Sequence, residues 1–380
     1  VHYQDGLGYQ DYYLGRELVR LGHQVDFIAS DVHFDFPQYD KTVKDIIGDK
    51  KVGVGVFVND YGCKVHRLKG TNKKYTGWIW LRGFKQKLLE LKPDLIIMHG
   101  VMNYQAIRLS LLRTKLNCDI VYDDHTTINV LNKSMIARFI FMLYRHTAVR
   151  LIERSALMIV GISNTCFEVL TKYYGFQGKS VELIPLGTDT EHFKPSKIKR
   201  KKYRKKLEIL DNEILIVHTG KIYKEKGSHR IMKVINENKH KFKLQRIVVL
   251  FVGTVADEYL STVEQSIGNL KFIHLAPTNQ EELSYIYNAA DFCVWPDHTT
   301  ISTLDASACG CPVICSTIMS ERVNSRSGKL VSSGNDEELL AAIELMYSSM
   351  QLRQEMGRHA RSYIVENFSW RMIARRFIQS

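Results

Sequence analysis

The sequence predicts an α/β protein with two doubly wound, parallel-sheet domains that face a central cleft. The chain has 380 residues, enough for two or three domains, and 45% of them are hydrophobic, enough for sizeable cores. Apolar runs of strand length alternate with helix-forming stretches along the chain, which is typical of parallel sheets covered by helices. No internal repeat or low-complexity segment interrupts this alternation.

Glycines and polar residues stand at the expected strand ends of the first half. Gly6 and Gly8 precede an expected helix at residues 9–21, and a glycine loop before a helix can hold a phosphate. Residues 93–100 and 120–125 each read as a buried parallel strand with polar residues at its carboxyl end. Ligands of doubly wound sheets bind at these ends, so the first half contains a candidate site.

The second half contains a strand, a glycine turn, two cations and a helix within residues 215–227. Gly220 forms the turn, and Lys221 and Lys226 are the cations. Such an arrangement suits a phosphate group, and the alternative is a solvated lysine-rich turn without function.

Two carboxylates lie eight residues apart between an apolar strand and a Gly-x-Pro turn. The strand ends at Pro296, Asp297 follows on a loop, and Asp305 falls in the first turn of a helix that ends by Gly310. Carboxylates accept pairs of hydroxyl hydrogen bonds, so the two can hold a polyol while free amides face an anion. The alternative is a surface loop with two solvated aspartates.

These segments follow one another as in the retaining glycosyltransferases of family 4, which the chain resembles over nearly its whole length. Residues 293–314 resemble the family signature with its two acids, and residues 184–195 match the interdomain hinge closely. The resemblance implies the GT-B fold. It also implies a Rossmann-like acceptor domain at 1–186, a Rossmann-like donor domain at 187–362, and a C-terminal helix at 363–380 that crosses back to the first domain.

The resemblance also implies the reaction, which is transfer of a sugar from a nucleoside diphosphate to an acceptor hydroxyl with retention of configuration. The catalytic residues are then His125, Lys221, Lys226 and Asp297, with His99 as the second match for the histidine. The donor site comprises Gly6, Gly8, Gly220, Lys221, Lys226, Asp297, Thr299, Thr300, Ile301 and Asp305. In this assignment Asp297 contacts the transferred sugar, Asp305 the ribose, and the two lysines the diphosphate.

The chain departs from the family pattern at several of these positions. Both signature acids are aspartate instead of glutamate, Thr300 stands where the family has glycine, and Lys221 replaces the usual arginine. Lysine keeps the charge but loses the bidentate geometry of arginine. The departures put the sugar specificity and the activity in question. The alternatives are a non-catalytic GT-B protein that binds nucleotides and a sugar-nucleotide epimerase on the same fold.

No metal or cofactor is expected, because GT-B enzymes work without one and no cysteines show a metal-ligand spacing. The seven cysteines read as reduced core residues of a cytosolic protein. Only Asp123, Asp124 and His125 suggest a metal-binding acidic pair, and their position after a first-domain strand argues against it.

The net charge of +13 indicates an anionic partner. Basic residues fill 197–206 and recur along an apolar segment at Lys133, Arg138, Arg145, Arg150 and Arg154. Residues 132–155 can lay an amphipathic face on an anionic cytoplasmic leaflet, as enzymes with lipid-linked acceptors do. The alternative is an ordinary helix with a solvated basic edge. Nucleic acid is not expected, since no motif for it accompanies the charge.

Location is expected to be cytoplasmic, with peripheral binding at the inner face of the membrane. No run reaches the ~18 to 20 apolar residues of a membrane span, and no signal peptide is visible. The expected acceptor is a glycan or a lipid-linked glycan of a surface polysaccharide, glycolipid or glycoprotein. Val1 is not an initiating methionine, and the first strand is nearly absent, so further residues are expected before it.

Overall fold

The computed structural model describes residues 3, 10–33, 39–42, 44–72, 79–126, 135–177, 180–243 and 245–379. They divide into two compact units, Val1–Leu186 with Ile373–Ser380, and Gly187–Met372. The prediction of two α/β domains with parallel sheets is confirmed. The return to the first unit falls at Ile373 instead of 363, because Ile364 and Phe368 belong to a core of the second unit.

The second unit is built on one six-stranded sheet in which all pairings are parallel. Its strands are β10 (Glu213–Thr219), β11 (Arg246–Val252), β12 (Lys271–Leu275), β13 (Phe292–Trp295), β14 (Val313–Ser316) and β15 (Gly328–Val331). They lie in the order β12-β11-β10-β13-β14-β15. The strand order therefore reverses between β10 and β13, which is where doubly wound sheets bind ligands.

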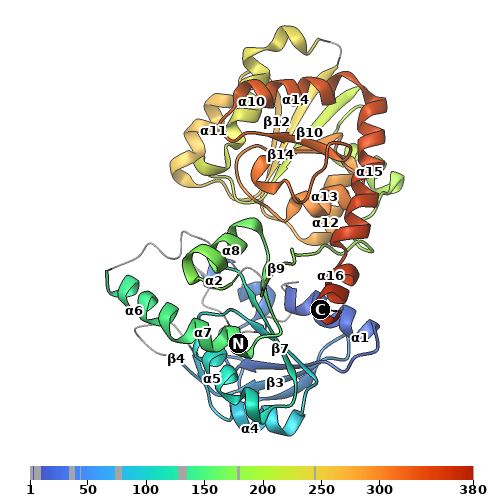
Figure 1. Cartoon of the computed structure of the whole chain (residues 1–380). Coiled ribbons are helices and arrows are strands. Elements are labelled where there is room, and N and C mark those ends of the chain that lie inside the picture. The colour runs from blue at the N-terminus through green and yellow to red at the C-terminus, as the bar shows by residue number, and fades with distance from the viewer. Residues whose placement is uncertain are drawn as a thin grey trace. The chain divides into compact units, whose positions relative to one another are not determined.

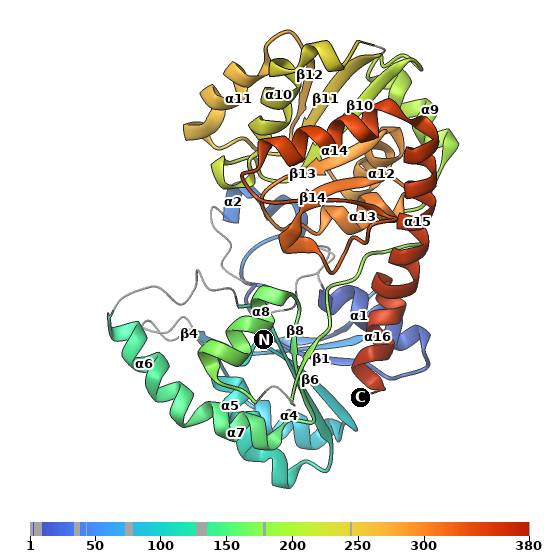
Figure 2. The ribbon, with the colours of Figure 1, turned by 45° about the horizontal axis from the view of Figure 1, so that its top comes forward.

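Helices cover both faces of this sheet (Figures 1 and 2). They are α9 (Lys197–Lys206), α10 (Ser228–Glu237), α11 (Leu260–Ile267), α12 (Gln280–Ala289), α13 (Ser302–Ala308), α14 (Asp336–Ser348) and α15 (Met350–Phe368), and short turns include η4 (Lys224–Lys226), η5 (Lys239–Lys241), η6 (Asp257–Tyr259) and η7 (Thr317–Met319). Ile214 and Ile216 of β10 share a core with α10, α11 and α14, whereas Leu215 and Val217 share one with α12, α13 and α15. Burial on both faces explains why these strands are continuously apolar in sequence.

The described residues of the first unit form three separate sheets. A parallel four-stranded sheet has the order β6-β7-β8-β9, a three-stranded sheet has the order β1-β3-β2, and β4 pairs with β5. The strands are β1 (Asp26–Ser30), β2 (Gly55–Val58), β3 (Lys64–Leu68), β4 (Gly70–Asn72), β5 (Ile79–Leu81), β6 (Leu95–His99), β7 (Asp119–Asp124), β8 (Met158–Gly161) and β9 (Val181–Leu183). Strand β2 runs antiparallel to β3, so this unit is not parallel throughout.

The described helices of the first unit have at most 12 residues each. They are α1 (Gln10–Arg20), α2 (Tyr39–Thr42), α3 (Lys44–Ile47), α4 (Phe84–Leu91), α5 (Tyr104–Leu112), η1 (Arg113–Lys115), α6 (Met135–His146), α7 (Ala148–Ser155), α8 (Asn164–Glu168), the π-helical η3 (Val169–Tyr174) and α16 (Trp370–Ile378), the last of which begins in the second unit. Among the described helices, none is long and apolar enough to cross a membrane. All seven cysteines are buried and free.

The basic run at 197–206 forms α9, and two of its arginines face inward. Arg200 Nη1 lies 2.8 Å from the carbonyl oxygens of both Ala289 and Ala290, at the end of α12. Arg200 and Arg204 also bind the two carboxylate oxygens of Asp291, at 2.8 and 3.1 Å. The arginines therefore satisfy the last carbonyls of α12, and part of the basic run has a structural role.

Candidate functional site

The loops after β10 and β13 meet at the reversal of strand order. Trp295, the last residue of β13, donates its indole N–H to the carbonyl of Thr219, the last residue of β10, at 2.9 Å. Gly220 follows with a φ of 114°, and a Cβ on Gly253 would overlap the Gly220 carbonyl oxygen. Residue 253 must be glycine because the backbone after β11 approaches the backbone after β10 so closely. The loops after β10 and β13 border the carboxyl edge of the sheet.

Lys221 and Lys226 bring two positive charges to this edge. Lys226 lies in η4, and its Nζ is 5.6 Å from the centre of the Tyr223 ring. Burial, and then the charge of Lys221, lower the pKa of Lys226. Neither lysine has an ion-pair partner among the residues that the structure describes. A bound anion would relieve both the burial of charge and the repulsion.

Asp297 is held by an ion pair that joins two elements. Its Oδ1 lies 2.5 Å from Nη1 of Arg230, in the first turn of α10, and accepts the Gly334 N–H at 2.8 Å. A Cβ on Gly227, whose φ is 62°, would overlap the other carboxylate oxygen. Asp297 therefore faces Gly227 and Arg230, and its expected contact with the transferred sugar stays a prediction.

Thr299, Thr300 and Ile301 continue the loop from Asp297 into α13. The Thr300 carbonyl accepts hydrogen bonds from Arg322 Nη1 at 2.7 Å and from Thr303 Oγ1 at 3.0 Å. These two hydrogen bonds fix the backbone of the loop at Thr300, while the side chain of Ile301 is exposed to solvent.

Asp305 lies in the first turn of α13 and contacts the segment that begins the second unit. Thr188 Oγ1 donates to Asp305 Oδ1 at 2.6 Å. Burial raises the pKa of Asp305 to about 7, although the Thr188 hydrogen bond acts in the opposite direction. The carboxyl group therefore changes its charge near neutral pH and can accept hydroxyl hydrogen bonds as an anion above it.

A second cluster lies at the carboxyl ends of β6 and β7 in the first unit. The carboxylate of Asp123 is fully buried and accepts His99 Nδ1 at 2.7 Å, Gln10 Nε2 at 2.9 Å and His125 Nε2 at 3.3 Å. Burial opposes charge on His99, but the nearby carboxylate outweighs it and raises the pKa of His99. Asp11 lies close enough to interact with His99 electrostatically, and burial raises its pKa.

Among the described residues, this cluster contains the one group of three side chains that could hold a metal ion. One ligand atom each from His99, Asp123 and His125 lies within 4.8 Å of the others. Two imidazoles and one carboxylate suit a transition metal. In this structure, however, Nδ1 of His99 and the Asp123 carboxylate form a hydrogen bond with each other at 2.7 Å. The sequence predicts His125 first and His99 second for the catalytic histidine, and both rings contact Asp123.

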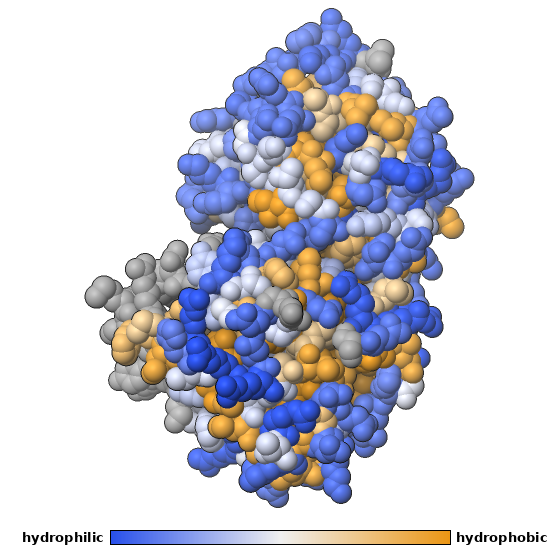
Figure 3. All heavy atoms as spheres, viewed as in Figure 1, coloured by the Kyte–Doolittle hydropathy of each residue, from blue (hydrophilic) through white to orange (hydrophobic). Residues whose placement is uncertain are grey.

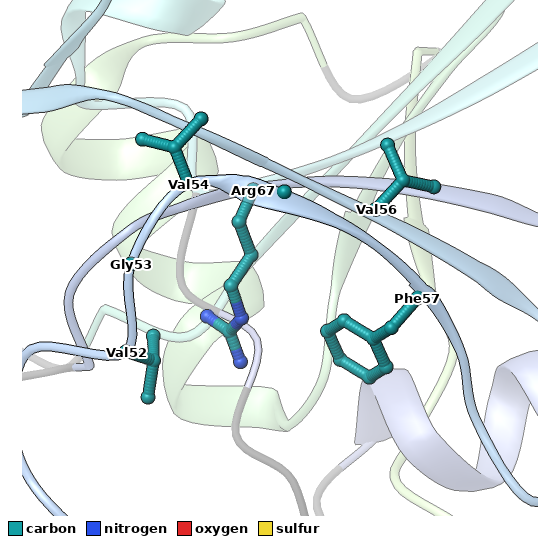
Figure 4. A pocket seen from close by; sticks show the side chains of 7 residues that line it. Val52, Gly53, Val54, Val56, Phe57 and Arg67 are labelled. Carbon is teal, nitrogen blue, oxygen red and sulfur yellow. The ribbon is translucent and has the colours of Figure 1, made fainter.

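A cavity of about 390 Å³ lies along strand β2 of the first unit. Figure 4 shows the guanidinium of Arg67 pointing between Val52 and Phe57. Arg67 is engaged by the carbonyl oxygens of Ser30 and Tyr3, at 3.0 and 3.2 Å. The cavity therefore holds a structural arginine and none of the expected site residues.

The expected residues fall into two groups. His125 belongs to the first unit. The segments that follow β10 and β13, each with the start of its next helix, carry Gly220, Lys221, Lys226, Asp297, Thr299, Thr300, Ile301 and Asp305. Gly6 and Gly8 lie outside the described residues. Sequence reasoning missed Arg230, and its one signal was a spacing of three residues from Gly227, which places it in the first turn of the following helix.

Two family models match the chain and together span most of it. The model of glycosyltransferase family 4 matches residues 5–192, and the model of glycosyl transferases group 1 matches residues 199–363. A D-inositol 3-phosphate glycosyltransferase of Paenarthrobacter aurescens is 25% identical over 59% of this chain and 57% of its own length. An uncharacterized glycosyltransferase of Methanocaldococcus jannaschii is 23% identical over 66% and 65%. The chain spans less than two thirds of these curated relatives.

Solved structures resemble the chain over nearly its whole length. HepE of Anabaena in complex with UDP has a TM-score of 0.69 and 17% identity, covering 99% of this chain and 97% of HepE. HepE has also been solved with UDP-glucose. Sucrose-phosphate synthase from Thermosynechococcus elongatus has a TM-score of 0.65 and 19% identity, covering 98% of this chain and 92% of the synthase. At identities this low, the structural likeness shows the fold alone.

Proposed function

The chain belongs to glycosyltransferase family 4 and has the GT-B fold, and from this we propose that it transfers a sugar from a nucleoside diphosphate to an acceptor hydroxyl, with retention of configuration. The observation that carries the proposal is the pair Lys221 and Lys226 beside Gly220, where the strand order of the second unit reverses. The UDP and UDP-glucose complexes of HepE support a nucleotide-sugar donor.

The activation barrier of the transfer comes largely from the negative charge that develops on the leaving group, and the site is suited to stabilise that charge. Transfer breaks the bond between the anomeric carbon and the β-phosphate oxygen, so negative charge grows on the departing diphosphate. Lys221 and Lys226 lack carboxylate partners among the described residues, and their full charge is available to that oxygen. Asp305 would accept the hydroxyl hydrogen bonds of the ribose.

The acceptor is assigned to the first unit, beside His125. The buried carboxylate of Asp123 contacts one ring nitrogen of each histidine, at 2.7 Å for His99 and 3.3 Å for His125. We assign the acceptor to the class of glycans or lipid-linked glycans, in synthesis of a surface polysaccharide, glycolipid or glycoprotein. The exposed apolar and basic helix described below supports a lipid-linked form.

Incubation with a panel of nucleotide sugars tests the proposal. An active enzyme releases free nucleoside diphosphate from one donor, faster when the acceptor is present. Tight binding of a nucleotide without release would instead favour a non-catalytic GT-B protein, and a new sugar nucleotide without transfer would favour an epimerase.

Transfer is expected to need no divalent metal, since the two lysines supply the positive charge at the diphosphate. Activity with the identified donor should be the same after treatment with EDTA and after later addition of Mg²⁺. Activity that EDTA abolishes and Mg²⁺ restores would contradict this expectation.

Helix α6 presents an apolar face to solvent. Phe139, Met142 and Leu143 are 63%, 51% and 58% exposed, and their spacing places them on one side of the helix. Apolar atoms lie on the surface in the region of α6 (Figure 3). Arg145 and Arg150 are exposed nearby, whereas Lys133 and the side chain of Arg138 lie outside the described residues. An apolar face flanked by arginines suits an anionic membrane surface.

Binding to vesicles with anionic lipid is expected, and it should weaken with salt. Each basic residue near such a surface contributes roughly 1 kcal/mol, within a Debye length of about 8 Å at physiological salt. Replacing Phe139 and Leu143 by serine should abolish sedimentation with vesicles. Leu111→Ser is the control, because Leu111 is also 63% exposed but lies on α5. A protein that ignores anionic vesicles at low salt would favour a soluble acceptor.

A further inference from the structure

We propose that Arg230 is a positioning residue of the donor site, which neutralises Asp297 so that the loop carrying Lys226 and Gly227 can receive an anionic diphosphate. This inference rests on the proposed function, because it takes that loop to meet the diphosphate. It concerns an arginine and an aspartate whose ion pair is built into the second unit.

Arg230 bridges two carboxylates from a nearly buried position. Its Nη1 lies 2.5 Å from Asp297 Oδ1, its Nε lies 2.6 Å from Asp336 Oδ1, and its side chain is 9% exposed. The two carboxylates are engaged by different nitrogens of one planar group, which a lysine cannot reproduce. Arg230 and Asp297 are 9% and 13% exposed, so removing one would leave the other as a poorly solvated charge, whereas Asp336 is 35% exposed.

The same contacts tie three segments of the chain together. Asp297 Oδ1 also accepts the Gly334 N–H at 2.8 Å, and Ser333 Oγ donates to the Asp297 carbonyl at 3.1 Å. At the start of α10, the backbone N–H of Arg230 donates to the Gly227 carbonyl at 3.0 Å. The ion pair thus fixes the loop after β13 and the loop after β15 against the start of α10.

Asp297 carries its negative charge directly against the cationic loop. Its second carboxylate oxygen lies where a Cβ on Gly227 would be, and Gly227 is the neighbour of Lys226. Without a partner, this carboxylate would repel a diphosphate and offset part of the attraction of Lys226. Arg230 and Lys233 balance Asp297 and Asp336, so the charge of Lys221 and Lys226 stays unopposed.

Charge neutralisation of Asp297 by Arg230 predicts a pattern in the binding of the bare nucleotide and of the sugar nucleotide. Arg230→Met leaves Asp297 unpaired and should weaken binding of UDP and of the identified sugar nucleotide equally, by about tenfold or more. Removing the carboxylate as well, in Arg230→Met with Asp297→Asn, should restore most of the affinity. Arg230→Lys keeps a positive charge, so its affinity for UDP should lie between the affinities of Arg230→Met and of the double variant.

Titration calorimetry of these variants with UDP and the sugar nucleotide measures the pattern. Steady-state kinetics of Arg230→Met alone should show a higher donor KM with kcat within about twofold of wild type. Arg246→Met is the control, because it removes an arginine that also pairs with a carboxylate, Glu213, but lies at the amino end of β11. Unchanged binding in Arg230→Met would overturn the inference. So would a double variant that binds UDP no better than the single variant. If the wild type binds no nucleotide at all, the proposed function itself fails and the inference falls with it.

Discussion

Replacing Lys226 by alanine is expected to lower kcat about 100-fold or more, which is the scale of losing one electrostatic stabiliser of a transition state. Lys226 is partly buried at the switch point, and burial together with Lys221 already lowers its pKa. No described carboxylate pairs with it, so its charge contributes little to folding. The thermal midpoint should therefore stay nearly unchanged.

Lys224→Ala provides the matched control for this prediction. Lys224 belongs to the same short turn, η4, but its side chain is exposed. Single-turnover rates at saturating donor, measured with thermal unfolding for each variant, separate loss of catalysis from loss of structure. Wild-type turnover in Lys226→Ala with a confirmed donor would remove Lys226 from the phosphate site.

Asp305→Ala is expected to weaken both the bare nucleotide and the sugar nucleotide, because the ribose is common to the two ligands. The carboxyl group has a pKa near 7, raised by burial. Since the ionised form accepts more hydroxyl hydrogen bonds, nucleotide affinity should rise with pH through about 7. Asp305→Asn should remove this pH dependence. Loss of the sugar nucleotide alone would instead place Asp305 against the sugar.

Stability should show the opposite trend with pH. The pKa of Asp305 is about 7 in the folded state and 3.8 for an unperturbed side chain, so the folded protein binds the proton more tightly. The free energy of unfolding should therefore fall as pH rises from about 4 to 7, by roughly 4 kcal/mol at most. Asp305→Asn should be more stable than wild type at pH 8 and equal to it at pH 4, as urea unfolding would show. If Asp305→Asn and wild type were equally stable at both pH values, burial would not raise the pKa of Asp305 in the folded protein.

Much of the second unit follows from local patterns in the sequence. Continuous apolar strands, the Gly220 turn and the helix around Asp305 each depend on neighbouring residues, so their spacing predicts the strand-loop-helix units. Parallel strands then bring Lys221, Lys226, Asp297 and Asp305 to one edge of the sheet. The family models confirm the resemblance read from these motifs.

Partners distant in sequence could not be predicted in the same way. Arg230 and Asp297 are 67 residues apart, and His99 and Asp123 belong to different strands. Each contact depends on which strands become neighbours and on how side chains turn within a loop. The sequence therefore placed Asp297 at the correct edge but did not show that Arg230 would hold its carboxylate.

The inward side of α9 limits how this part of the chain can diverge among its relatives. Arg200 and Arg204 end α12 by binding its last carbonyls and Asp291, and lysine cannot reproduce that forked geometry. Lys201 and Lys205 are exposed on the same helix. Drift should therefore exchange these lysines freely for other polar residues, while the two arginines persist or disappear together with Asp291.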